Sequence, residues 1–251
     1  MKEAQLTILE NRPLTASVYR LSLRGEGMES QRPGQFVNIA LPGRFLRRPI
    51  SVFDQEGDEL RLIYKTVGAG TEQLSRLRPG ETLNVLTGLG NGYDLSRAGN
   101  APLLLGGGVG VPPLYLLAKE LLRAGKTVRA VLGFNTAAEV FGETDFRALG
   151  CEVTVATADG SYGQKGFVTD ALPEEYSYFY TCGPEPMLRA VYRAAKTDGQ
   201  FSFEERMGCG FGACMGCSCR VKDPEHPGEI RYKRICREGP VLEKEEILWD
   251  A

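Results

Sequence analysis

Hydrophobic and polar residues alternate in short runs along the first 98 residues. Alternation with a period of two places every second side chain on one face, so each run predicts a half-buried strand. Turn residues such as Pro33-Gly34 and Pro79-Gly80 separate the runs. The predicted strands are residues 5–9, 17–23, 36–41, 50–53, 60–64 and 82–86, with one short helix at 71–77. This spacing predicts a small antiparallel barrel or sandwich.

From about residue 100 the pattern changes to apolar strands that alternate with helices. Strands are predicted at 102–105, 128–132, 152–156 and 178–182, and helices at 113–124 and 184–196. Such alternation is typical of a parallel α/β sheet. After residue 199 the pattern breaks into a cysteine-rich tail. The fold class is therefore α/β plus all-β, with predicted domains at 1–98 (antiparallel barrel), 99–198 (parallel α/β) and 199–251 (small C-terminal domain).

Composition and charge narrow the classes of function. The 251 residues are 42% hydrophobic and 25% charged, which is typical of a globular protein, and the net charge of −2 gives no basic field for nucleic acid. The most apolar stretch, residues 101–117, is broken by three glycines and Pro112-Pro113. We therefore expect no nucleic-acid partner, no signal peptide and no membrane span, and a cytoplasmic location.

Five of the seven cysteines lie after residue 208. This asymmetry favours a metal or cluster site in a reducing compartment over a disulfide framework. The spacing Cys209-x4-Cys214-x2-Cys217, followed by Cys236, is typical of plant-type [2Fe–2S] ferredoxins. A structural zinc site and unconnected buried thiols are the alternatives, but zinc sites usually offer two Cys-x2-Cys pairs. We expect Cys219 to be a non-ligand.

A glycine-rich segment runs from the strand at 102–105 into the next helix and contains Gly106, Gly107, Gly108 and Gly110. Glycines there allow a dinucleotide pyrophosphate to reach the helix N-terminus, although a tight turn without a ligand is the alternative. Two later loops, which contain Asp159 and Cys182-Gly183-Pro184, also follow strands. Because ligands bind at the carboxyl ends of parallel strands, the three loops predict a nucleotide cleft.

The preferred nicotinamide cofactor is predicted from the segment after the second strand of this sheet. A cation normally meets the 2′-phosphate of NADP(H). Residues 133–145 contain no Lys or Arg but three acids, Glu139, Glu143 and Asp145. This segment therefore predicts NAD(H).

Two motifs in the N-terminal region make a family resemblance specific. They are Arg47-Arg-Pro-Ile-Ser51 and Ile63-Tyr-Lys-Thr-Val-Gly-Ala-Gly-Thr71. Together with the glycine loop and Cys182-Gly-Pro-Glu-Pro-Met187, they resemble the ferredoxin reductase-like flavoproteins. With the cysteine motif added, essentially the whole chain is similar to electron-transfer subunits of NAD-dependent dihydroorotate dehydrogenases. The resemblance implies an FAD-binding barrel, an NAD-binding α/β domain and a [2Fe–2S] domain.

Site residues follow from the resemblance. It implies that Ser51 lies near the reactive edge of the flavin, and that Gly70 and Thr71 offer backbone N–H groups to the FAD phosphate. We also expect Cys182 to lie near the nicotinamide and to act with Ser51 in catalysis. The implied FAD contacts are Arg48, Pro49, Ile50, Ser51, Ile63, Tyr64, Lys65, Gly70 and Thr71.

The resemblance also implies a function. Dihydroorotate would be oxidised at the FMN of a separate catalytic subunit in pyrimidine biosynthesis, and its electrons would pass through the cluster and FAD of this chain to NAD+. Two such chains would assemble with two catalytic chains as a heterotetramer. One alternative is a free-standing NADH-dependent reductase that serves another redox partner. The other is a zinc-stabilised binding module without redox cofactors.

Overall fold

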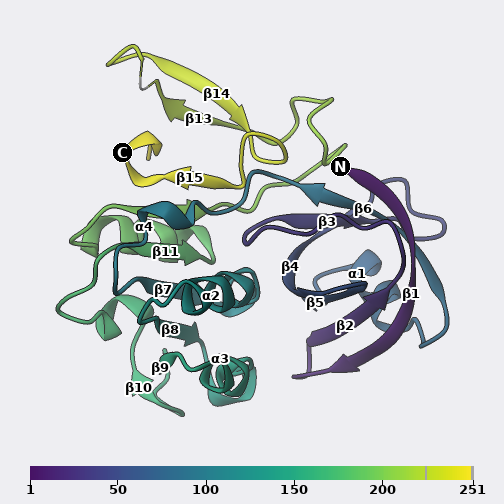
Figure 1. The fold of residues 1–251 in the computed structure, drawn as a ribbon, viewed down its shortest axis with the longest axis horizontal. Coiled ribbons are helices and arrows are strands. Elements are labelled where there is room, and N and C mark those ends of the chain that lie inside the picture. Colours follow the sequence, from purple (N-terminus) through teal and green to yellow (C-terminus); the bar gives the residue numbers. More distant parts are fainter. Residues whose placement is uncertain (224, 250–251) are drawn as a thin grey trace.

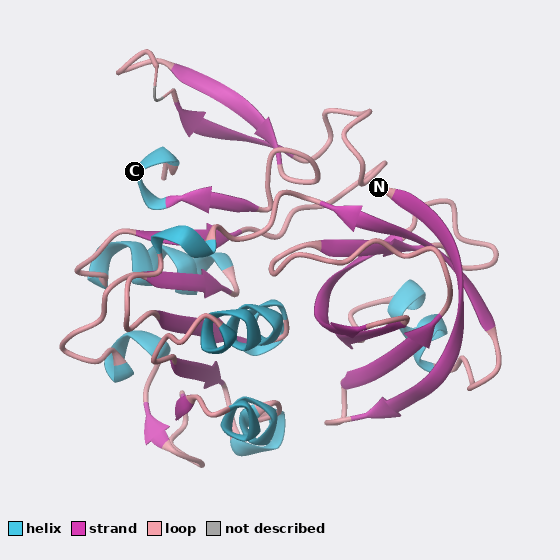
Figure 2. Cartoon of the chain, in the orientation of Figure 1, coloured by secondary structure: helices cyan, strands magenta, loops and turns pink. Residues whose placement is uncertain are grey.

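A closed barrel stands beside an open sheet, and a two-stranded hairpin lies above the sheet (Figure 1). The structure is a computed structural model that describes residues 1–223 and 225–249. Figure 2 shows that most helices belong to the open sheet and that strands dominate the barrel. Among the described residues, no helix is long and apolar enough to cross a membrane.

The barrel confirms the antiparallel architecture that the alternation predicted. Its strands follow the order β1-β2-β5-β4-β3-β6. Alternate side chains such as Leu6 and Ile8, or Leu21 and Leu23, are fully buried in its core. A short helix, α1 (Ala69–Ser75), follows β5. The strands are β1 (Lys2–Pro13), β2 (Val18–Arg24), β3 (Phe36–Ile39), β4 (Arg48–Glu56), β5 (Glu59–Lys65) and β6 (Thr82–Leu89).

The open sheet is parallel except for β15 at one edge, and its order is β10-β9-β8-β7-β11-β12-β15. The predicted α/β architecture is therefore confirmed. Its strands are β7 (Leu103–Gly107), β8 (Arg129–Phe134), β9 (Glu152–Thr157), β10 (Gln164–Lys165), β11 (Phe179–Cys182), β12 (Gly199–Ser202) and β15 (Val241–Glu243).

Helices cover both faces of this sheet. Leu104 packs toward α2 (Pro113–Arg123) and α3 (Glu143–Leu149), whereas Leu105 packs toward α4 (Glu185–Ala194). Five 3-10 helices complete the described fold: η1 (Leu95–Arg97), η2 (Gly108–Gly110), η3 (Ala137–Glu139), η4 (Val168–Ala171) and η5 (Lys244–Glu246).

Several elements were not expected from the sequence. Helix α3 occupies part of the segment that was interpreted only as a cofactor-selecting loop. Strands β12 and β15 come from the predicted cysteine-rich tail but extend the open sheet. Their pairing joins residues far apart in the chain, for example Phe201 and Leu242, and short runs of three or four residues carry too little periodicity to reveal it.

The hairpin places two cysteines at its base. It consists of β13 (Ser218–Lys222) and β14 (Ile230–Arg234), which pair antiparallel. Cys217 comes directly before β13, and Cys236 follows β14 by two residues. Both cysteines are buried in the apolar core that also holds α4 and β12. The hairpin therefore positions two thiols deep in the molecule.

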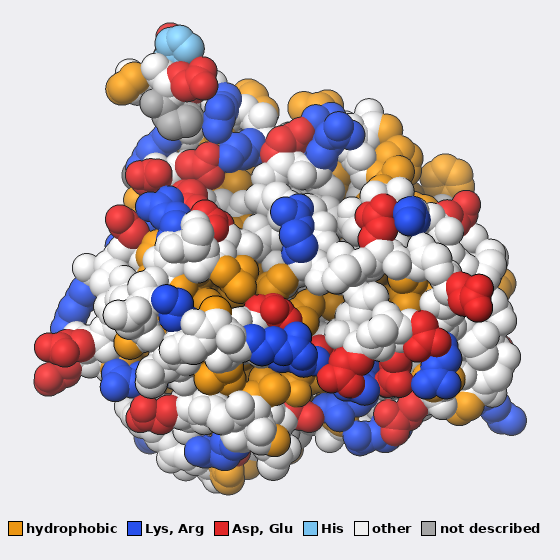
Figure 3. Space-filling view, viewed as in Figure 1, with side chains coloured by type: hydrophobic (Ala, Val, Ile, Leu, Met, Phe, Trp, Pro, Cys, Tyr) orange, Lys and Arg blue, Asp and Glu red, His pale blue; other side chains and the backbone are white. Residues whose placement is uncertain are grey.

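An ion network joins the barrel to α2. Lys119 of α2 is 8% exposed, and its Nζ lies 2.8 Å from Asp54 Oδ1 and 2.8 Å from Glu56 Oε1, both on β4. Arg61 of β5 also pairs with Asp54, at 3.1 Å. Figure 3 shows acidic and basic side chains gathered between the helices and the barrel. These contacts hold the barrel against a helix that covers the open sheet.

Candidate functional site

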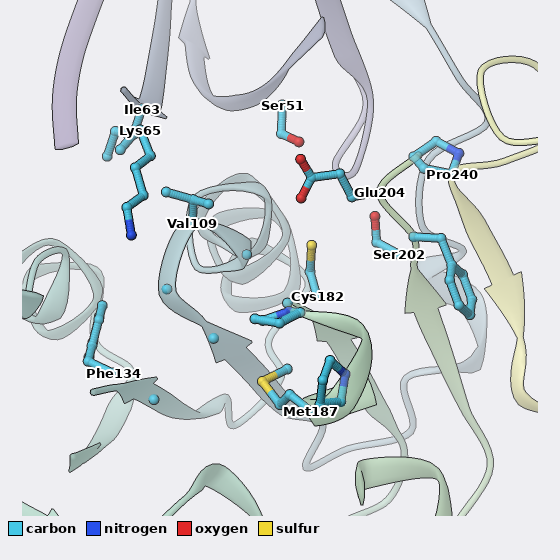
Figure 4. Close-up of a pocket in the computed structure, with 18 of the residues that line it drawn as sticks. Ser51, Ile63, Lys65, Val109, Phe134, Cys182, Met187, Ser202, Glu204 and Pro240 are labelled. Carbon is cyan, nitrogen blue, oxygen red and sulfur yellow. The ribbon is translucent and has the colours of Figure 1, made fainter. Parts of the chain in front are cut away.

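A cavity of about 770 Å³ lies between the barrel and the carboxyl ends of the parallel strands. This is the edge at which ligands bind in open α/β sheets, and the volume is within the range of cofactor sites. Figure 4 shows side chains from the barrel and from the sheet that face each other across it. Two of the three strand-end loops, the glycine loop and the loop after β11, line this cavity, whereas the loop that contains Asp159 does not.

Most of the predicted cofactor residues line this cavity. From the barrel they include Ser51 on β4 and Lys65 at the end of β5 (Figure 4). Tyr64 turns its ring into the barrel core, where its hydroxyl lies 3.0 Å from Asn11 Oδ1. The predicted residues in the lining are Pro49, Ile50, Ser51, Ile63, Tyr64, Lys65, Gly107, Gly108, Gly110, Cys182, Gly183 and Pro184.

Three further predicted residues lie together at the first turn of α1, outside the lining of the cavity. A Cβ at Gly70 would stand 2.0 Å from Arg48 Nε, so the guanidinium lies directly against this glycine. Thr71 Oγ1 accepts a hydrogen bond from the Val67 N–H at 2.9 Å and donates to the Gly68 carbonyl at 3.1 Å. The hydroxyl thus closes the turn before α1, and the first N–H groups of a helix have no partner within the helix. A cation and free N–H groups in one place fit a phosphate.

The glycine loop and the loop after β11 pack against each other. A Cβ at Gly110 would lie 2.2 Å from the Cys182 carbonyl oxygen, and one at Gly107 would lie 2.4 Å from Met187 Sδ. Gly108 has a φ of +51° and open space around it, so its backbone is accessible to a ligand. Gly106 instead packs against Val111 and allows the tight step from strand to helix.

The two predicted catalytic residues lie on opposite walls of the cavity. Ser51 comes from the barrel, whereas Cys182 ends β11 with its sulfur directed into the cavity (Figure 4). Burial raises the pKa of Cys182 to about 12, although a hydrogen bond with Ser202 opposes this. Cys182 is therefore a neutral thiol at pH 7. It suits contact with a ring better than nucleophilic attack.

Sequence reasoning missed two polar residues of this site, Ser202 and Glu204. Both line the cavity, and Figure 4 shows the Glu204 carboxylate and the Ser51 hydroxyl pointing toward each other. They were missed because β12, which delivers them to this edge, was not predicted. The alternation of Phe201 and Phe203 with polar residues was the available sign of a strand.

The three acidic residues of the segment after β8 lie in three different environments. Glu139 lines the cavity and its Oε2 accepts hydrogen bonds from the Asn135 N–H at 3.2 Å and Nδ2 at 2.9 Å. Glu143 instead binds Arg147 and the Tyr162 hydroxyl. Asp145 pairs with Arg20 of the barrel at 2.7 Å. Of the three acids, Glu139 is therefore the one held at the cavity.

Asp159 shapes the turn after β9 and lies outside the cavity lining. Its Oδ1 accepts hydrogen bonds from the Ser161 N–H at 2.9 Å and hydroxyl at 2.6 Å. The Ser161 hydroxyl in turn accepts a hydrogen bond from the Ala137 N–H at 2.7 Å. Asp159 thus connects two loops that flank the cavity, and its contact with a cofactor stays a prediction.

The four predicted cluster thiols come together in two linked pairs. The N–H of Cys209 lies 3.5 Å from Cys214 Sγ, and the N–H of Cys214 lies 3.4 Å from Cys209 Sγ. The N–H of Cys236 lies 3.5 Å from Cys217 Sγ. Two pairs of thiols fit a binuclear cluster, in which each iron takes two thiolates. Among the described residues, no three His, Cys, Asp or Glu side chains converge as around a single metal ion.

The loop offers backbone donors to the sulfur of Cys209, whereas burial raises the pKa of Cys236 to about 12. A Cβ at Gly208 would lie 3.2 Å from Cys214 Sγ. Although burial opposes it, hydrogen bonds from the backbone N–H groups of Cys214 and Phe211 lower the pKa of Cys209 to about 6. The Arg234 guanidinium holds the loop through the Gly212 carbonyl at 2.6 Å. Backbone donors aimed at a thiolate are what a cluster site requires.

The remaining cysteines have separate surroundings. Cys219 lies opposite Lys233 in the hairpin register, and burial raises the pKa of its thiol to about 11. Cys151 is buried, and burial likewise raises the pKa of its thiol to about 11. Both thiols are protonated at pH 7 and behave as small apolar side chains.

Comparisons with known proteins agree with this geometry. Residues 204–248 match the iron-sulfur cluster binding domain of dihydroorotate dehydrogenase B. The chain is 45% identical to the electron transfer subunit of dihydroorotate dehydrogenase B (NAD(+)) from Geobacillus sp. (strain WCH70), covering 99% of each chain. It is 43% identical to the corresponding subunit from Bacillus pumilus (strain SAFR-032), covering 98% of each chain.

A solved structure shares the whole architecture. The chain is similar to one from an NADH-dependent reduced ferredoxin–NADP oxidoreductase, with a TM-score of 0.84, 31% identity and coverage of 97% of this chain and 90% of that one. The cluster-domain match and the ferredoxin reductase-like fold indicate FAD, NAD and an iron–sulfur cluster as cofactors. The chain belongs to the family of electron transfer subunits of NAD-dependent dihydroorotate dehydrogenase B.

Proposed function

We propose that this chain receives electrons from a separate, FMN-containing subunit that oxidises dihydroorotate, and delivers them to NAD+. The net reaction converts dihydroorotate and NAD+ into orotate, NADH and H+. The observation that carries the proposal is that two of the four paired thiols, Cys217 and Cys236, belong to an apolar core that also borders the dinucleotide cavity. The full-length similarity to the dihydroorotate dehydrogenase B subunits favours a catalytic dihydroorotate-oxidising partner. It disfavours a free-standing reductase that serves another redox partner.

The residues of the chain have distinct tasks in this function. FAD, when bound, supplies both hydride exchange with nicotinamide and single-electron exchange with the cluster. We propose that Arg48 and the first turn of α1 hold its phosphates, and that Pro49, Ile50, Ile63, Lys65 and the backbone of Tyr64 form the wall against its ring. Cys209, Cys214, Cys217 and Cys236 hold the [2Fe–2S] cluster.

The other wall binds the nicotinamide dinucleotide. We propose that Gly106, Gly107, Gly108 and Gly110 admit its pyrophosphate, with Asp159, Gly183 and Pro184 shaping the loops beside it. Cys182 positions the nicotinamide ring. The Ser51 hydroxyl and the Glu204 carboxylate hold and move a proton at the edge of the cavity where they point toward each other (Figure 4).

The assembly and its location complete the proposal. We propose a heterotetramer of two such chains and two catalytic chains in the cytoplasm, where its thiols stay reduced. We also propose the domain boundaries 1–98, 99–198 and 199–251 as functional modules, although β12 and β15 extend the open sheet. The mass of the purified complex checks the stoichiometry.

An anaerobic titration of the purified chain with NADH tests the proposed function. We expect the flavin and iron–sulfur absorption bands to bleach together at equivalents that match one FAD and one cluster. With the catalytic subunit added, dihydroorotate should bleach the same bands. A preparation without flavin, or with zinc in place of iron, would contradict the proposal.

Cys182→Ala is expected to slow reduction of the flavin by NADH about tenfold, because misplacing a ring relative to its reaction partner lowers the rate. FAD content should stay near one per chain, since Cys182 comes from the opposite wall. Stopped-flow absorption measures the rate. Cys151→Ala, which removes a buried thiol at another strand of the sheet, is the control. Unchanged kinetics in Cys182→Ala would leave the thiol with a packing role only.

Glu139→Gln is expected to lower the KM for NADPH about tenfold, which corresponds to about 1.4 kcal/mol of binding free energy. The reason is that its carboxylate, held at the cavity by Asn135, repels a 2′-phosphate. Steady-state kinetics with NADH and NADPH measure the preference. Glu143→Gln is the matched control, because its carboxylate is held by Arg147 and Tyr162. Equal effects of both substitutions would contradict a specific role for Glu139.

A further inference from the structure

The outer face of β3 lies between the cavity and the thiols. Side chains alternate along a strand, and Val37 and Ile39 belong to the barrel core. Phe36 and Asn38 therefore point outward, yet they are only 3% and 1% exposed. Buried side chains on the outer face of a barrel strand must be covered by another part of the chain. Here the cover includes the cluster loop.

Phe36 borders both cofactor sites. It lines the cavity and lies opposite Ser51 in the pairing of β3 with β4. It also belongs to the apolar core that contains Cys217 and Cys236. One aromatic side chain therefore borders the cavity and belongs to the same apolar core as two of the cluster thiols.

Asn38 contacts the cluster loop directly. Its Nδ2 donates to the Cys209 carbonyl oxygen at 3.3 Å. A Cβ at Gly210, which has a φ of +76°, would lie 2.3 Å from this nitrogen. In register, Asn38 lies opposite Pro49 of the proposed flavin wall. A single hydrogen bond thus joins the backbone of a cluster cysteine to the strand that pairs with that wall.

The fold alone does not require an asparagine at this position. The Asn38 Oδ1 atom is buried and has no hydrogen-bond partner among the described residues. A buried amide oxygen without a partner lowers stability, whereas a leucine of similar size would not. Asn38 therefore lowers stability relative to a leucine. This indicates that its contact with Cys209 has a role beyond packing.

We propose that Phe36 and Asn38 form the electron route between the cluster and the flavin. This rests on the proposed function. Asn38 holds the Cys209 end of the cluster loop against β3, and Phe36 fills the remaining gap toward Ser51. Two successive one-electron transfers along the route, with one proton from solvent, convert NAD+ into NADH. The two electrons are those that dihydroorotate loses at the partner subunit.

Stopped-flow reduction by NADH of the full chain, loaded with FAD and cluster, tests the route. Bleaching of the flavin band reports hydride transfer from NADH to FAD, which precedes the route. Bleaching of the cluster band reports electron transfer along the route, from FAD to the cluster. In Asn38→Leu and in Phe36→Leu we expect cluster bleaching to slow about tenfold, as is typical when the surroundings of a metal site are altered. Flavin bleaching should keep its rate in Asn38→Leu, because Asn38 does not line the cavity, and in Phe36→Leu cluster bleaching should slow more than flavin bleaching does. Iron content and the EPR spectrum of the reduced cluster should match the unsubstituted chain.

Asn84→Leu is the matched control. Asn84 lies on the neighbouring strand β6, and its amide oxygen is also buried without a partner among the described residues. In Asn84→Leu, cluster bleaching should keep the rate of the unsubstituted chain. Unchanged cluster bleaching in Phe36→Leu and in a cluster-loaded Asn38→Leu would overturn the route. Loss of iron in Asn38→Leu with an unchanged rate in Phe36→Leu would also overturn it and assign Asn38 to cluster assembly. Failure of NADH to bleach the flavin of the unsubstituted chain would instead count against the proposed function.

Discussion

Cys236→Ser is expected to abolish the iron–sulfur cluster and to leave NADH-dependent reduction of the flavin intact. Cys236 is the thiol that comes from outside the cysteine loop, and its N–H is paired with Cys217 Sγ. A serine hydroxyl is a far weaker ligand for iron than a thiolate. Transfer from dihydroorotate to NAD+ in the complex should then fall at least about 100-fold. Iron and sulfide analysis, together with EPR of the reduced protein, measures the loss.

Cys219→Ser is the matched control for this substitution. Cys219 lies on β13 of the same hairpin, but in register with Lys233 and not at its base. Iron content and transfer should stay near those of the unsubstituted chain. A cluster that survives Cys236→Ser and disappears in Cys219→Ser would show that the fourth ligand was assigned to the wrong thiol.

Lys119→Met is expected to destabilise the chain by about 3 kcal/mol, because it leaves the buried Asp54 carboxylate with Arg61 as its remaining partner. For a protein of this size the midpoint of thermal unfolding should fall by about 6–12 °C. Calorimetry measures the shift. Arg123→Met on the same helix is the control, because Arg123 forms an exposed pair with Glu120 and should change stability by less than about 0.5 kcal/mol.

The dependence on pH gives this prediction a second test. The hydrogen bond from Lys119 lowers the pKa of Glu56 below its usual 4.5. A lowered carboxyl pKa contributes stability above the ordinary value and loses it as the pH falls through the lowered value. The difference between the original chain and Lys119→Met should therefore shrink below about pH 4.5. Adding Asp54→Asn to Lys119→Met should recover part of the loss, since no uncompensated charge stays buried.

Local patterns in the sequence were sufficient for much of this fold and site. The short alternating runs predicted an antiparallel barrel or sandwich, and the alternation of apolar strands with helices predicted the parallel α/β sheet. Both patterns are visible within a few residues of the sequence. The cluster ligands were predicted for the same reason: Cys209, Cys214 and Cys217 have a spacing that one short loop imposes. The dinucleotide cleft followed because strand-end loops of a parallel sheet share one edge.

The tertiary structure decided what depends on contacts between distant segments. It brought Ser202 and Glu204 to the cavity through β12, whose short run carries little periodicity. It selected Glu139 from three acids, because hydrogen bonds and ion pairs hold the other two elsewhere. It also placed Asn38 against Cys209, a contact across 171 positions of the chain. The sequence by itself determined which chemical groups are present and their local elements, whereas only packing between distant segments decided which of these groups meet.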